Sequence, residues 1–149
     1  MTNPKVSVFK NLKFSNLTAI CIGIVYLWFG LLKFFPDLSP AEDIAKRTIN
    51  VLSFGFIPSY IAIILLAIWE TGLGILLIIN KYSRLAIRLA LIHMLFTFTP
   101  LILFPELTFS DSPFSFTLLG QYIVKNIIII SVLLTLLNKN YNTQTLKVK

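Results

Sequence analysis

The chain has 149 residues, of which 56% are hydrophobic and only 13% are charged. Soluble domains carry about 25% charged residues, so this composition excludes an ordinary soluble protein. Its mean hydropathy of +0.84 and formal net charge of +7 predict a membrane protein with basic flanking segments. Four apolar runs come near or reach the length of a spanning helix, which is about 20 residues. They are Leu17–Phe35, Ile61–Ile79, Leu85–Phe104 and Tyr122–Leu137.

The runs predict an all-α integral membrane four-helix bundle, with residues 1–149 forming a single transmembrane domain. We expect helices over about 17–35, 59–79, 83–104 and 120–138. An amphipathic surface helix over about 40–53 is expected in the first outer loop, opened by a capping box from Ser39 to Glu42. The first run is too long for the apolar region of a signal peptide, so we expect it to be retained. The phenylalanine-rich loop Pro105–Leu119 is expected to pack over the outer mouth of the bundle.

Basic residues concentrate on one side of the predicted bundle. Nine of the thirteen precede the first helix, lie at the turn between the second and third helices, or follow the fourth. They are Lys5, Lys10, Lys13, Lys81, Arg84, Arg88, Lys139, Lys147 and Lys149. The opposite loops hold Lys46 and Arg47 with five of the six acids. Because basic segments remain cytoplasmic, both termini are predicted inside, and the charge indicates topology with no nucleic-acid partner.

Glu70 lies close to the centre of the second run. An acid at mid-depth in a bilayer costs several kcal/mol unless it is neutral or paired, so Glu70 marks a candidate functional site. Gly74, one turn further on, and the nearby Gly72 predict a close helix contact beside this acid. The alternative is a protonated carboxyl group bonded to a neighbouring backbone or hydroxyl group, with no functional role.

Polar residues on the first and third helices are expected to face Glu70. Tyr26, Gly30 and Lys33 share one helix face, which makes Lys33 a candidate cation for a ligand or for Glu70. The only histidine, His93, matches Glu70 in predicted depth, so a hydrogen bond between them is a hypothesis. The alternatives are that Lys33 extends to the outer headgroups and that His93 is a satisfied core residue.

On the fourth helix, Gln121, Tyr122 and Lys125 group on one face, although Lys125 could also extend to the headgroups. A site with two cations, Lys33 and Lys125, and one acid, Glu70, predicts a ligand that is electron-rich or anionic. A quinone headgroup and a small oxyanion both fit that description. The ligand-binding candidates are Tyr26, Lys33, Glu70, His93, Gln121, Tyr122 and Lys125.

Several ordered segments resemble the DoxX-like membrane proteins, and the resemblance covers roughly Leu17 to Leu137. The segments are Trp28–Pro36, Leu38–Glu42, Trp69–Gly74, Phe98–Leu101 and Gly120–Asn126. The resemblance implies a small four-helix protein of the bacterial inner membrane. It also implies an association with redox or thiol metabolism, since some members are subunits of a thiosulfate:quinone oxidoreductase.

The composition limits the chemistry of the chain alone. One histidine cannot supply a bis-histidine haem, and the single Cys21 cannot form a thiol–disulfide pair. We therefore expect no metal site and no bound cofactor apart from a quinone, with a larger redox complex supplying electrons. Two alternatives remain: a non-catalytic accessory subunit of a membrane complex, and a solute carrier. The carrier is disfavoured because no inverted repeat or paired broken helix is visible.

Overall fold

The computed structural model describes residues 4–81, 83–110 and 115–145, with side chains described from Asn16 to Lys139 within these ranges. The described chain is all-α, as predicted, apart from one bridge between Phe109 and Phe116. The helices are α1 (Pro4–Leu32), α2 (Glu42–Leu52), α3 (Ser59–Ile78), α4 (Ser83–Phe96), α5 (Thr99–Leu103), α6 (Pro105–Thr108), α7 (Leu118–Val124) and α8 (Asn126–Thr145).

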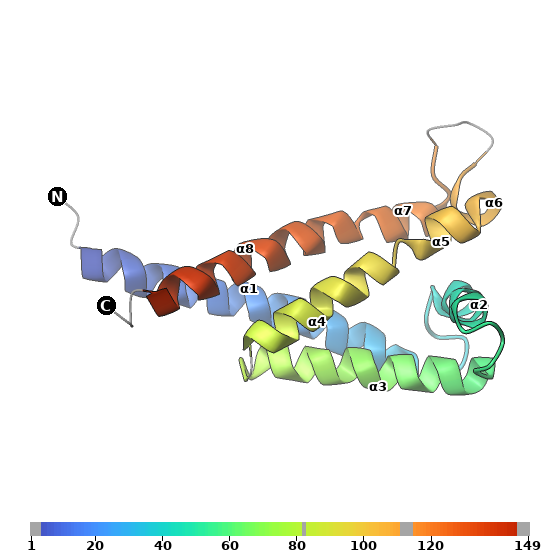
Figure 1. Ribbon diagram of the computed structural model, residues 1–149, viewed down its shortest axis with the longest axis horizontal. Coiled ribbons are helices and arrows are strands. Elements are labelled where there is room, and N and C mark those ends of the chain that lie inside the picture. Colours follow the sequence, from blue (N-terminus) through green and yellow to red (C-terminus); the bar gives the residue numbers. More distant parts are fainter. Residues whose placement is uncertain (1–3, 82, 111–114, 146–149) are drawn as a thin grey trace.

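The long helices run roughly along one axis, and α1 packs most extensively against α3 (Figure 1). The α4 helix contacts both α3 and α8, and α8 also contacts α1. The start of α1, the end of α8 and the turn between α3 and α4 lie toward one end of the molecule (Figure 1). The short helices α2, α5 and α6 lie toward the other end, where α2 packs on α3 and α5.

Three stretches of the described chain are long and apolar enough to cross a membrane: Ser59–Ile78, Ser83–Leu103 and Leu118–Lys139. The second contains α4 and α5, and the third contains α7 and most of α8, so each includes a local interruption of the helix. The apolar part of α1, Asn16–Leu32, is shorter than these three. The α1 helix is continuous from Pro4, so it begins well before the predicted start at about residue 17 and includes the basic N-terminal segment.

Glycines allow α1 and α3 to approach closely. A Cβ atom added at Gly23 would lie 2.8 Å from the carbonyl oxygen of Gly74, and one at Gly74 would lie 2.6 Å from the Leu27 nitrogen. A Cβ atom at Gly30 would lie 2.6 Å from the Thr71 nitrogen. Such distances leave no room for a side chain, so the two backbones are in contact only because these positions are glycine.

The expected capping box before α2 does not form. Ala41 occupies the N-cap position without a side-chain hydrogen bond, and the buried Ser39 hydroxyl has no partner within the described chain. The Glu42 carboxylate instead accepts a hydrogen bond from the Asp37 backbone N–H at 3.0 Å and pairs with Lys46 at 2.5 Å. The hydrogen bond to Glu42 raises the pKa of Lys46. The prediction was wrong because these contacts commit Glu42 to partners other than the backbone of residue 39.

The segment before α7 is fixed by Thr108 and Thr117. A Cβ atom at Gly120 would lie only 2.0 Å from the Thr108 carbonyl oxygen, so α6 and α7 touch through their backbones. The Thr117 hydroxyl accepts a hydrogen bond from the Gly120 N–H at 3.1 Å and donates to the Leu107 carbonyl at 2.8 Å. The start of α7 is thereby capped and tied to α6.

Two neighbouring glycines of α3 provide a test of the helix contact. Gly74→Ala forces a methyl group against the backbone of α1, and we expect it to destabilise the protein by about 1–3 kcal/mol. Gly72→Ala is the matched control, because no atom lies within 4 Å of its added Cβ. It should leave stability unchanged or raise it by about 0.5–1 kcal/mol, since alanine favours the helix. Reversible unfolding in detergent measures both, and equal effects would contradict the contact.

Candidate functional site

Lys33 and Glu70 form a buried ion pair where α1 ends against the middle of α3. Lys33 Nζ lies 2.5 Å from Glu70 Oε2, and the two side chains are 6% and 9% exposed. Lys33 also donates to the Phe29 carbonyl oxygen at 3.4 Å. The pair forms where Gly30 lets α1 approach α3, since a Cβ atom at Gly30 would lie 3.0 Å from Glu70 Cβ. Lys33 therefore turns into the bundle, and the alternative that it extends to the headgroups is wrong.

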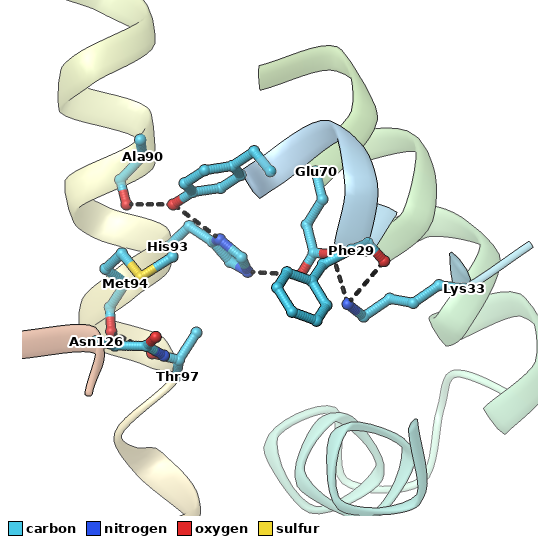
Figure 2. A network of polar contacts seen from close by, with 9 residues as sticks. Phe29, Lys33, Glu70, Ala90, His93, Met94, Thr97 and Asn126 are labelled. Atoms are coloured by element: carbon cyan, nitrogen blue, oxygen red, sulfur yellow. Dashed lines mark hydrogen bonds and ion pairs between the residues drawn. The ribbon is translucent and has the colours of Figure 1, made fainter. Parts of the chain in front are cut away.

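The other carboxylate oxygen of Glu70 faces α4. Glu70 Oε1 lies 3.5 Å from His93 Nε2, and His93 Nδ1 lies 3.3 Å from the Tyr26 hydroxyl oxygen. The Tyr26 hydroxyl lies 3.0 Å from the Ala90 carbonyl oxygen, to which it can donate. Figure 2 shows these contacts as one continuous path from the end of α1, through α3 and α4, back to α1. The hypothesis that Glu70 and His93 meet at the same depth agrees with this geometry.

The Tyr26 hydroxyl carries one hydrogen, which it can donate to the Ala90 carbonyl oxygen or to His93 Nδ1. When it donates to Ala90, a proton on His93 Nδ1 can be donated to the hydroxyl oxygen. When it donates to Nδ1, the ring proton lies on Nε2, which faces Glu70 Oε1. The direction of the Tyr26 hydroxyl is therefore coupled to the tautomer of His93.

A second polar link joins the interruptions of two membrane-length stretches. Thr97 lies between α4 and α5, and Asn126 begins α8 directly after the break from α7. Asn126 Nδ2 donates to Thr97 Oγ1 at 3.0 Å, and Thr97 Oγ1 donates to the Met94 carbonyl at 2.6 Å (Figure 2). Sequence reasoning did not select Asn126 as a site residue. A polar residue within an apolar run was the available signal.

A cavity of about 560 Å³ is lined both by the Lys33–Glu70–His93–Tyr26 path and by the Thr97–Asn126 link. Its size falls within the range of about 300–1,000 Å³ that is typical of ligand-binding pockets. Apolar and aromatic side chains form most of the wall, including Phe29, Trp69 and Phe96. Thr48 of α2 also lines it, with several of its apolar neighbours. None of the described residues of the loop Pro105–Leu119 lines this cavity, so α2 occupies the place predicted for that loop.

Six of the seven predicted ligand-binding candidates line the cavity: Tyr26, Lys33, Glu70, His93, Tyr122 and Lys125. Gln121 does not line it, because one helix position turns its side chain by about 100° from that of Tyr122. The Gln121 amide is exposed and donates to the Phe116 carbonyl oxygen at 3.2 Å.

Tyr122 of α7 and Lys125, which follows α7, contribute to the cavity wall. The Lys125 ammonium lies 5.5 Å from the centre of the Tyr122 ring. The same ring meets Phe29 of α1 edge-on, with the ring centres 5.7 Å apart. Lys125 is itself exposed, whereas Lys33 is buried against Glu70. The two lysines of the cavity therefore have different surroundings.

The all-helical fold and its three membrane-length apolar stretches define an integral membrane protein. Residues 17–104 match the family DoxX, and because the match covers more than half of the chain, the protein belongs to this family. DoxX-family proteins are small membrane proteins. No curated protein and no solved structure matches the chain. The matched segment includes Lys33, Glu70 and His93 and ends before Tyr122 and Lys125.

The buried pair makes a prediction about stability. Lys33→Met leaves the Glu70 carboxylate in an apolar interior without its cation, and we expect a loss of about 3 kcal/mol or more. The double variant Lys33→Met/Glu70→Met removes both charges and should recover most of that loss. Lys46→Met is the comparison for removing a more exposed lysine, 29% against 6% for Lys33, and should have a smaller effect. Unfolding in detergent measures all three, and a double variant no more stable than Lys33→Met would contradict the pairing.

Proposed function

We propose that this DoxX-family protein is a redox-associated membrane subunit whose cavity binds the headgroup of a quinone. The observation that carries the proposal is an apolar cavity, between membrane-length helices, with a few polar groups in its wall. Quinone carbonyls need hydrogen-bond donors, which Lys125 and Tyr122 supply, and the ring needs apolar and aromatic walls. A small oxyanion is the second ligand that the same cations suit. Electrons would come from a partner in a larger membrane complex.

The proposal includes an arrangement in the membrane. Asn16–Leu32 of α1 would be the fourth span, completing a four-helix bundle, and α2 would lie as an amphipathic helix at the outer surface. Lys81 lies in the turn between α3 and α4, Arg88 in the first half of α4 and Lys139 in the second half of α8. Basic flanks remain cytoplasmic, so both termini would face the cytoplasm of a bacterial inner membrane.

Single cysteines test this topology. In a Cys21→Ser background, we expect Lys46→Cys to react with an impermeant maleimide in intact cells and Lys139→Cys to react only after the cells are opened. The reason is that α2 would lie outside and the end of α8 inside. Labelling of position 139 but not 46 in intact cells would reverse the assignment.

Trp69 reports directly on the cavity, because it lines the wall while Trp28, the other tryptophan, does not. In a Trp28→Phe variant in nanodiscs, we expect a short-chain ubiquinone to quench the Trp69 fluorescence with a saturable dependence on concentration. Quinones quench tryptophan at close range, and a defined site saturates.

The matched control is Trp69→Phe, which leaves only the exposed Trp28. Quinone dissolved in the lipid should quench Trp28 without saturation. If Trp69 is also quenched without saturation, the cavity holds no quinone, and the proposed quinone site is wrong.

One observation favours a second candidate function, that of a non-catalytic accessory subunit. Lys33, Glu70, His93 and Tyr26 contact one another in a closed path that needs no ligand. Such polar contacts between membrane helices contribute about 1 kcal/mol each and can serve only to hold the bundle together. The quenching experiment separates the two functions, since an accessory subunit has no reason to bind quinone at a saturable site.

A further inference from the structure

We infer that the cavity selects an amphiphile whose headgroup carries a negative charge, and that Lys125 is the residue that recognises this charge. The inference rests on the proposed ligand-binding role of the cavity and specifies the class of ligand. It assigns different roles to two lysines that appear equivalent in the sequence.

The charges of the cavity wall do not cancel. The lining residues with a permanent charge are Lys33, Glu70 and Lys125. Lys33 and Glu70 are 2.5 Å apart, so they neutralise each other. Within the part of the chain that the structure describes, no carboxylate lies within 4.0 Å of Lys125; its recorded contact is with the Tyr122 ring. The wall therefore carries one cation that a ligand can pair with, which favours an anionic headgroup.

Lys125 occupies a special position in its membrane-length stretch. It separates α7, which ends at Val124, from α8, which begins at Asn126. The Ile128 N–H bonds to the Lys125 carbonyl at 3.1 Å, a tight turn in place of regular α-helix. Short interruptions of this kind inside a helix often mark functional sites. At 1.5 Å per residue, Lys125 lies about 10 Å along the membrane-length stretch from Leu118, where that stretch begins.

The rim of the cavity favours a ligand with a hydrocarbon tail. Ile92 and Phe96 line the cavity, are exposed, and lie on the membrane-length stretch Ser83–Leu103. Exposed apolar side chains on membrane-length helices face lipid, so the cavity opens toward the hydrocarbon region. A tail can remain there while the headgroup reaches Lys125. A small water-soluble anion would gain nothing from these contacts.

A pair of probes that differ in charge tests the inference. An alkyl hydroxynaphthoquinone is an anion at neutral pH, because its hydroxyl group is a vinylogous carboxylic acid, and its methyl ether is neutral. In the Trp28→Phe protein, we expect the anion to quench Trp69 with about 10-fold higher affinity than the ether, because hydrogen bonds to charged groups are stronger. Trp69→Phe corrects for partition of each probe into the lipid.

Variants identify the residue responsible. Lys125→Gln should reduce the preference for the anion to about 2-fold or less, because glutamine keeps a donor but has no charge, so binding of the anion falls more than binding of the ether. Lys125→Arg should retain the preference. Lys139→Gln is the control, since it removes the same charge from the far end of α8. A preference that persists in Lys125→Gln overturns the assignment.

The remaining outcomes separate this inference from the proposed function. Equal, saturable affinities for the anion and the ether overturn the inference and leave the quinone site intact. If neither probe nor ubiquinone binds saturably, the proposed site itself is wrong. Displacement of the anionic probe by thiosulfate or sulfate at similar concentrations shows recognition of a free oxyanion, which overturns the requirement for a tail. Retention of the probe at high sulfate supports the amphiphile.

Discussion

The burial of Glu70 in the middle of a membrane-length helix is the constraint on which the rest of the structure depends. A carboxylate in that position is costly unless a cation reaches it. Lys33 reaches it at 2.5 Å because α1 lies directly on α3, and that approach requires Gly23, Gly30 and Gly74. The ion pair therefore depends on the glycine contact, because the close backbones bring Lys33 and Glu70 together and keep them from lipid.

The ion pair also determines where the cavity lies. Glu70 uses one oxygen for Lys33 and turns the other toward His93, so the polar path runs along one side of the space between the helices. The opposite side is formed where the two interrupted stretches are joined by the Thr97–Asn126 hydrogen bond. Regular helices with long side chains would fill such a space. The interruptions and the α2 helix hold the walls apart, and a cavity of about 560 Å³ remains.

Much of this arrangement could be predicted from the sequence, because helical periodicity and rise are regular. The shared face of Tyr26 and Lys33 and the matching depths of Glu70 and His93 follow from residue spacing alone. Gln121 was wrongly grouped with Tyr122 in the cavity wall, because adjacent positions of a helix point about 100° apart. The role of α2 was missed because the segment that covers a cavity is decided by tertiary contacts, such as those of α2 with α3 and α5, that no local pattern encodes.

The two lysines of the cavity illustrate how burial changes the meaning of a charge. By composition they are equal, and both lie in the wall of the same space. Lys33 is 6% exposed and forms an ion pair with Glu70, so the carboxylate largely cancels its positive field within the cavity. Lys125 keeps its field, because an aromatic ring provides only a weak partner for an ammonium group. Selectivity for a charged headgroup must therefore come from the exposed lysine, while the buried one makes the fold around it possible.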